Sequence, residues 1–278
     1  MSHNEKNSHS NENQNYKKQL EVIGYKESTV KKLLKIAREY QDFGNDNLEQ
    51  YYQHLKTRNH KQNPNKTLSN GTLNFHIYGL NVYSKYLEDY CFSSIENNRI
   101  KLLKEKTSLK KIEVLTLEEI KILFGNSQNN RDTAVLACLY HLGLRASEAC
   151  NLQIEDLDFA ANLVFVAKSK TGYQRQIPLP KKAKEIFENY LENRKNPAQT
   201  NYFLQGLKGK LTPDGLAQIV KRTAKKSTIN KSVYPHLLRH SIATHLLSNK
   251  MNIEQVAQFL GHKSLESTQR YTHLLEEL

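Results

Sequence analysis

Apolar residues recur three or four positions apart along most of the chain, and this spacing predicts a mainly α-helical protein. From Tyr16 to about residue 92 the pattern predicts several successive helices, with these apolar positions: Val30, Leu33, Leu34, Ala37, Leu48, Tyr51, Tyr52, Leu55, Leu73, Ile77, Leu80, Tyr83 and Leu87. No strand pattern interrupts them, and the polar residues 59–66 predict a loop. We therefore expect a helical domain over residues 16–106, preceded by a polar, disordered tail at residues 1–15.

A second domain is expected over residues 114–278, after a basic linker at residues 107–113. Thr116 and Glu119 match the capping box that opens many helices, in which each residue satisfies a backbone amide of the other. The apolar stretch 134–143 then predicts a core helix.

Two short strand-like runs, 163–166 and 176–179, interrupt the helical spacing and flank a turn near Gly172. A β-hairpin is therefore predicted inside the second domain. Lys168 and Lys170 come just before this turn, where a long cation can reach a partner that the helices only surround. The expected fold class is mainly α, in two domains, with a small β-sheet or hairpin in the second.

One face of a predicted helix carries several titratable side chains. Pro235 suits the first turn of this helix, and His236, Arg239 and His240 fall on the same face. Two histidines four residues apart can bind zinc, but the charge of Arg239 between them would repel a cation. We therefore expect neither a metal nor a cofactor, and we expect His240 to be a hydrogen-bonded structural histidine beside the site.

The following helix is expected to begin at its cap, Asn252, and to end at Gly261, a residue suited to the left-handed conformation that stops helices. His262 comes immediately after that end, and Tyr271 comes nine residues later, on a further short helix. These positions predict that a phenol and an imidazole lie within reach of Arg239.

The chain is strongly basic. It has 278 residues, with 41 Lys and Arg against 28 Asp and Glu, and a formal net charge of +13. Such an excess in both halves favours a polyanionic partner such as nucleic acid. The three cysteines have no CxxC spacing, which argues against a disulfide framework or a cysteine zinc site. No apolar run is long enough to span a membrane, so we expect a cytoplasmic protein.

These motifs together resemble a known family. Residues 236–247 (HLLRHSIATHLL), residues 260–262 (LGH) and Tyr271 resemble the second conserved box of the tyrosine recombinases, also called the lambda-integrase or Xer family. Residues 143–148 (GLRASE) resemble its first box, and residues 168–172 (KSKTG) resemble the hairpin that carries its lysine. The resemblance covers residues 112 to 273 and extends to the first half only in size and helical character.

The resemblance implies a core-type DNA-binding domain at residues 16–106 and a catalytic domain at residues 114–278. It also implies six catalytic residues: Arg145, Lys170, His236, Arg239, His262 and Tyr271. Lys168 is the alternative to Lys170. Glu148, one turn from Arg145, is expected to orient an arginine or a histidine.

The chemistry of these residue types suits cleavage of a phosphodiester. Arginines donate paired hydrogen bonds to nonbridging oxygens and stay charged, so Arg145 and Arg239 fit the stabilisation of the transition state. Tyr271 would attack phosphorus, and Lys170 would protonate the leaving 5′-hydroxyl. His236 would accept the phenolic proton or orient the phosphate, and His262 would donate a hydrogen bond to a nonbridging oxygen. The product would be a 3′-phosphotyrosyl intermediate.

A helix expected from residues 212–214 onward carries Gln218, Lys221, Arg222 and Lys225 on one flank. These side chains could enter a major groove, with glutamine and arginine contacting bases and the lysines contacting phosphates. A solvated polar face is the alternative.

The function predicted from this sequence is site-specific recombination of double-stranded DNA by a homotetramer acting on two duplexes. The reaction would resolve dimers or cointegrates, or integrate or excise a mobile element, and the need for an accessory protein or partner recombinase is left open. A non-catalytic DNA-binding regulator and a type IB topoisomerase-like relaxing enzyme are the alternatives. The apolar tail formed by Leu274, Leu275 and Leu278 would dock into a neighbouring subunit or pack on its own domain.

Overall fold

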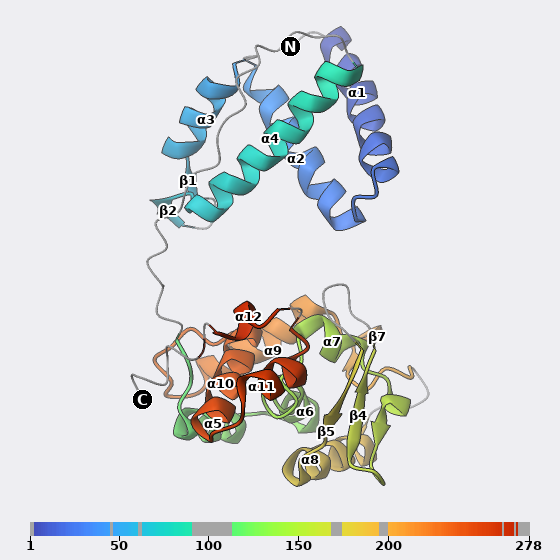
Figure 1. Cartoon of the computed structure of the whole chain (residues 1–278), viewed down its shortest axis with the longest axis vertical. Coiled ribbons are helices and arrows are strands. Elements are labelled where there is room, and N and C mark those ends of the chain that lie inside the picture. The colour runs from blue at the N-terminus through green and yellow to red at the C-terminus, as the bar shows by residue number, and fades with distance from the viewer. Residues whose placement is uncertain are drawn as a thin grey trace. The chain divides into compact units, whose positions relative to one another are not determined.

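The chain divides into two compact units, Met1–Ser108 and Leu109–Leu278. Each unit has its own cluster of buried apolar side chains. The computed structural model (Figure 1) describes residues 3–44, 47–60, 63–90, 113–167, 174–194, 200–262, 264–269 and 271. The predicted linker at residues 107–113 lies outside the described residues except for Glu113, and so does the apolar tail at residues 274–278.

The described part of the first unit contains four helices and one small hairpin: α1 (His3–Val22), α2 (Glu27–Phe43), α3 (Leu48–Thr57), β1 (Asn59–His60), β2 (Asn63–Thr67) and α4 (Asn70–Tyr90). The long helix α4 packs against α2, and Gly79 allows their close approach. A Cβ atom at Gly79 would lie only 2.6 Å from Ile36 Cδ1.

The structure differs from the sequence prediction at two places in this unit. The tail expected at residues 1–15 is helical from His3 onward, because it is the first part of α1. Asn13 is buried there and donates a hydrogen bond to Gln41 Oε1 of α2 at 2.8 Å, so tertiary contacts stabilise a sequence of weak helical tendency. Within the range 59–66 that is expected to be a loop, Asn59–His60 pairs antiparallel with the strand Asn63–Thr67.

The second unit is also mainly helical, and the predicted fold class is confirmed. Its helices are α5 (Leu117–Gly125), α6 (Asn130–Tyr140), α7 (Ala146–Asn151), α8 (Lys181–Glu192), α9 (Pro213–Lys225), α10 (Pro235–Ser248), α11 (Ile253–Leu260) and α12 (Glu266–Gln269). A 3₁₀ turn, Ile154–Asp156, leads into a three-stranded sheet of β3 (Leu157–Asp158), β4 (Leu163–Val166) and β5 (Arg175–Pro178), and a short hairpin pairs β6 (Gln205–Gly206) with β7 (Gly209–Lys210).

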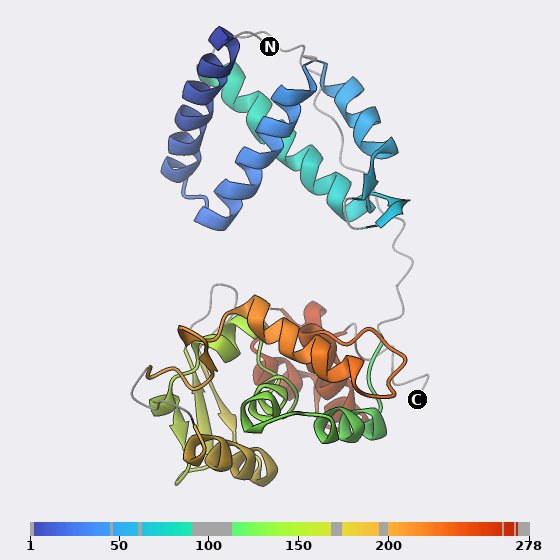
Figure 2. The ribbon, with the colours of Figure 1, turned by 180° about the vertical axis from the view of Figure 1, so that it is seen from behind.

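Helix α6 lies at the centre of this unit and packs against α8, α9 and α10. Residues 134–139 of α6 are fully buried, as expected of the core helix that the apolar run predicts. Figure 2 shows α9 along one side of the unit and α8 on the opposite side.

The three-stranded sheet packs against the helices through β5, which contacts α11. Strand β4 pairs antiparallel with β5, with Val164 opposite Ile177 and Val166 opposite Arg175. In β5, Arg175 and Ile177 are the inward-facing, buried positions and their neighbours are exposed. The predicted hairpin is confirmed at its base; its tip, with Lys168 and Lys170, lies outside the described residues.

Local signals at the helix ends are confirmed. Thr116 and Glu119 form a reciprocal capping box at the start of α5. Helix α11 begins after Asn252, whose side chain accepts a hydrogen bond from the Glu254 amide. Gly261 ends α11 in the left-handed conformation, with φ of 65°. Within the described ranges, no helix is long and apolar enough to cross a membrane.

Candidate active site

Two left-handed glycine turns supply backbone carbonyls to the predicted catalytic arginines. Gly143 has φ of +56° and its carbonyl accepts a hydrogen bond from Arg239 Nη1. The Gly261 carbonyl accepts one from Arg145 Nη2 at 3.1 Å. The first turn is tightly packed, since a Cβ atom at Gly143 would lie 2.9 Å from side-chain atoms of Leu260 and Phe259. The structure thus brings Arg145 and Arg239 together at the end of α11.

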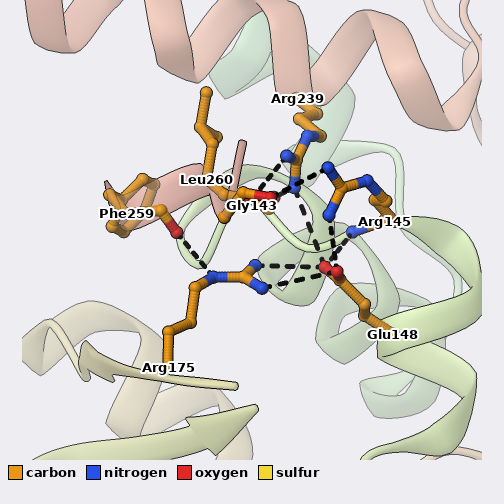
Figure 3. Close-up of polar contacts among 8 residues, drawn as sticks. Gly143, Arg145, Glu148, Arg175, Arg239, Phe259 and Leu260 are labelled. Carbon is orange, nitrogen blue, oxygen red and sulfur yellow. Dashed lines mark hydrogen bonds and ion pairs between the residues drawn. The ribbon is translucent and has the colours of Figure 1, made fainter. Parts of the chain in front are cut away.

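A single buried carboxylate joins three arginines (Figure 3). Glu148 Oε1 lies 2.7 Å from Arg145 Nη1, and Glu148 Oε2 lies 3.0 Å from Arg175 Nη2 and 3.8 Å from Arg239 Nη1. Burial alone would raise the pKa of Glu148, but the hydrogen bond and charge of Arg175, followed by the contacts of Arg145, bring it down to about 2. Glu148 therefore orients arginines, as its position in the sequence predicts.

Arg175 is the site residue that sequence reasoning missed. It comes from the first position of β5 and donates to both oxygens of Glu148, and its Nε donates to the Phe259 carbonyl at 2.8 Å. The sequence contained one usable signal. Alternation along the strand puts Arg175 on the same face as the buried Ile177, and a charged residue on an apolar face needs a buried partner.

The cluster is a strong anion site by charge. Arg145, Arg175 and Arg239 together carry three positive charges against the one negative charge of Glu148, which leaves two in excess. Burial, followed by the charge of Arg145, lowers the pKa of Arg239 to about 9, so it remains protonated at neutral pH. The excess positive charge suits a phosphodiester, and it suits still better a transition state that gathers negative charge.

Tyr271 lies beside this cluster, in the packing of α10 and α11. It is 2% exposed and belongs to an apolar cluster with Ala243, Leu247, Val256 and Leu260. Its hydroxyl lies 2.7 Å from His240 Nδ1, so His240 is hydrogen-bonded beside the site as expected. Instead of lying on the short helix that the sequence predicts, Tyr271 follows α12, which has only four residues.

The two other predicted histidines lie on either side of this pair. His262 Nδ1 lies 2.6 Å from Thr268 Oγ1, and its ring is stacked on Tyr271 with ring centroids 6.3 Å apart. His236, in the first turn of α10, lies near His240, with 6.3 Å between ring centroids. Partial burial, and then the charges of Arg239 and Arg145, lower the pKa of His236. A neutral imidazole that can accept a proton is therefore favoured there.

The four predicted DNA-contacting residues are all exposed on α9. Arg222 has an additional contact, because its Nη2 lies 2.6 Å from Oδ2 of the fully buried Asp132 in α6. Gln218, Lys221 and Lys225 share the same exposed face. No group of three or more metal-ligating side chains occurs among the residues that the structure describes.

Comparison with known proteins gives one family match and several similar proteins. Residues 113–277 match the Phage integrase family. Tyrosine recombinase XerA of Pyrococcus horikoshii is 36% identical over 201 residues, which are 71% of this chain and 70% of that protein.

Two solved structures share the fold. One is the Tn1549 transposon integrase in complex with transposon right end DNA, with a TM-score of 0.70 at 21% identity and 93% of both chains covered. The other is a lambda integrase tetramer bound to a Holliday junction, with a TM-score of 0.66 at 15% identity, covering 93% of this chain and 75% of that one. Since the family match covers nearly all of the unit in which Arg145, Arg239 and Tyr271 meet, the chain belongs to the phage integrase family and is a tyrosine recombinase.

Proposed function

We propose that this chain cleaves and rejoins double-stranded DNA at a specific site through a covalent bond between Tyr271 Oη and a 3′-phosphate. One observation supports the proposal: the turn at residues 260–262 contacts both predicted catalytic arginines and the predicted nucleophile. Leu260 packs against Tyr271 and its carbonyl accepts from Arg239, while the next carbonyl, that of Gly261, accepts from Arg145. The excess positive charge and the phenol thus meet at one turn.

In the proposed reaction, Tyr271 Oη attacks phosphorus and the bond to the 5′ oxygen breaks. His236 accepts the phenolic proton or orients the phosphate, and Arg145, Arg239 and His262 hold the nonbridging oxygens. Lys170, the proposed general acid, gives a proton to the leaving 5′ oxygen; Lys168 is the alternative. The 5′-hydroxyl of a partner strand then attacks the phosphotyrosine, which releases Tyr271 and joins the strands.

Tyr271 and Arg239 are both nearly inaccessible, with 2% and 3% exposure. A phosphodiester cannot reach them without movement. The proposed reaction therefore requires that the segment around residues 262–271 shifts when DNA binds.

Strand exchange between two duplexes needs more than one copy of the site. We therefore propose a homotetramer on two DNA duplexes, an assembly supported by the lambda integrase tetramer on a Holliday junction. Gln218, Lys221, Arg222 and Lys225 of α9 are proposed DNA contacts. The reaction would resolve dimers or cointegrates, or integrate or excise a mobile element, with or without an accessory protein or partner recombinase. A DNA substrate fits a cytoplasmic location.

The nucleophile is tested with a nicked suicide duplex, whose recombination site is first selected from a randomised duplex pool by binding to the wild-type protein. Wild type is expected to form a protein–DNA adduct that survives denaturation, whereas Tyr271→Phe binds the duplex without forming it. Tyr140→Phe is a matched control, because Tyr140 is also buried and its hydroxyl lies 2.8 Å from His245 Nδ1. An adduct that persists in Tyr271→Phe would show the assignment to be wrong.

The class of reaction is tested on supercoiled plasmids with one or two copies of that site. A site-specific recombinase deletes or inverts the segment between two copies and does not relax a plasmid without the site. A type IB topoisomerase-like enzyme relaxes any supercoiled plasmid, and a regulator leaves both plasmids unchanged.

A further inference from the structure

We propose that Arg175 is a positioning residue of the recombinase site. In this proposal, which depends on the function proposed above, Arg175 fixes Glu148 and the end of α11 against the base of the hairpin. Arg145 and the turn that carries His262 are thereby held in place for cleavage, although Arg175 itself does not touch the reacting phosphate.

The first support is that Arg175 joins two elements through all three of its guanidinium nitrogens. Nη2 and Nη1 lie 3.0 Å and 3.3 Å from the two oxygens of Glu148 in α7, and Nε donates to the Phe259 carbonyl at 2.8 Å. Only 6% of its side chain is exposed. Arg145 is more open, with 18% of its side chain exposed. Each guanidinium nitrogen of Arg175 thus has a protein acceptor, either Glu148 or the Phe259 carbonyl (Figure 3).

The second support is that each partner of Arg175 either contacts a predicted catalytic residue or directly precedes backbone that does. Glu148, which Arg175 holds, also binds Arg145 through Oε1. Phe259, whose carbonyl it holds, is followed by Leu260 and Gly261, the two residues whose carbonyls accept from Arg239 and Arg145. Loss of Arg175 would therefore loosen both attachments of Arg145 at once.

The third support is the close fit between Arg175 and the Gly261 turn. A Cβ atom at Gly261 would lie 2.7 Å from Arg175 Nη1 and 3.0 Å from its Cζ. The guanidinium therefore lies directly against the backbone that leads into His262. Since Arg175 pairs with Val166 at the base of the hairpin, the same side chain connects this turn to the strands that lead toward Lys170.

The test compares two variants, Arg175→Met and Arg175→Lys, with wild type in the full chain. Two quantities are measured on the nicked suicide duplex: the single-turnover rate constant for adduct formation and the Kd for the duplex. Arg175→Met is expected to lose about a hundredfold in rate, as for a small displacement of catalytic groups, with Kd changed little. Arg175→Lys keeps the charge and one donor direction, so it is expected to recover part of the rate.

Arg194→Met is the matched control for burying a methionine in place of a paired arginine. Arg194 is 7% exposed in the same unit, and its Nη2 donates to the carbonyls of Thr200 and Tyr202. It contacts none of the site residues in these hydrogen bonds. Its loss is expected to lower the melting temperature while leaving the adduct rate of the folded protein near that of wild type.

A double-mutant cycle with Glu148→Gln tests the route of action. If Arg175 acts through Glu148, the rate loss of the double variant is expected to be much smaller than the product of the two single losses. Either single substitution already frees Arg145, so the second has little left to remove. Independent, multiplicative losses would overturn the route through Glu148.

The outcomes separate this proposal from the proposed function. Absence of any adduct with wild type overturns the function and the positioning role with it. A normal wild-type adduct together with unchanged rates in both Arg175 variants overturns the positioning role alone. Equal losses of rate and binding in Arg175→Met and Arg194→Met also overturn it, since a general loss of structure then explains the effect. If Arg175→Met does not fold, Arg175→Lys decides; if neither folds, Arg175 is structural and the proposal is wrong.

Discussion

Three guanidiniums share Glu148, yet each one has a different environment. Arg145 is the most open and Arg239 the most buried, with 18% and 3% of their side chains exposed. Arg239 is held by two backbone carbonyls, an arrangement that neutralises little of its charge. The cluster can therefore keep two excess positive charges in a buried place. It can do so because backbone dipoles, rather than further carboxylates, solvate the cations.

The pKa of Glu148 leads to a prediction about stability. An ordinary glutamate has a pKa of 4.5, and that of Glu148 is lowered to about 2. A carboxylate whose pKa is lower in the folded state stabilises the fold above pH 4.5, and this contribution is lost as the pH falls from 4.5 to about 2. Its full size is on the order of 3 kcal/mol.

We therefore expect the gap in free energy of unfolding between wild type and Glu148→Gln to narrow over that pH range. This difference is measured by urea unfolding at each pH, with hydrogen exchange in peptides of α6 as the probe. Glu155→Gln, at an exposed glutamate in the same unit, is the control and should follow the wild-type curve. A gap that stays constant from about pH 5 to about pH 2 would contradict the assigned role of Glu148 in binding arginines.

At the scale of elements, α9 packs one side in the unit and carries the proposed DNA contacts on the other. Its apolar side, which includes Leu216, Ile219 and Val220, is buried in the unit. On the other side, Arg222 is joined to the buried Asp132 of α6, so this cation also anchors the helix. The sequence predicts Arg222 as a DNA contact but could not reveal this ion pair, because the partner lies 90 residues earlier.

The proposed contribution of the exposed α9 lysines to DNA binding can be tested through the salt dependence of the binding constant. Lys221→Gln is expected to weaken binding to any duplex and to reduce the slope of log K against log salt by about 0.9, as for loss of one phosphate contact. Lys182→Gln on α8, on the opposite side of the unit, should leave the slope unchanged (Figure 2). An unchanged slope in Lys221→Gln would mean that this face of α9 is merely solvated.

At the scale of the whole molecule, the chain has two separate cores. Leu55 is fully buried in the first, and Leu136 is fully buried in the second. The two units therefore have separate sources of hydrophobic stabilisation, and a single unfolding transition is not required of the chain.

Leu55→Ala is expected to destabilise only the first unit, by about 2–5 kcal/mol, which is typical of a buried leucine truncation. Hydrogen exchange should then become faster in α2, α3 and α4 and stay unchanged in α6 and α10. Leu136→Ala should give the reverse pattern. Equal acceleration in both units after either substitution would show that they unfold as one.

The sequence by itself determined the helical character of both units, the helix caps at Thr116 and Asn252, and the end of α11 at Gly261. These features depend on nearest neighbours and on short-range periodicity, which a sequence displays directly. The motif spacing was also enough to predict the family. Only the tertiary structure decided that residues 3–15 are helical, that Asn59–His60 pairs with Asn63–Thr67, and that Arg175 and Glu148 meet across the fold. Each of these depends on partners distant in sequence, and burial and charge pairing between such partners are fixed only when the chain has folded.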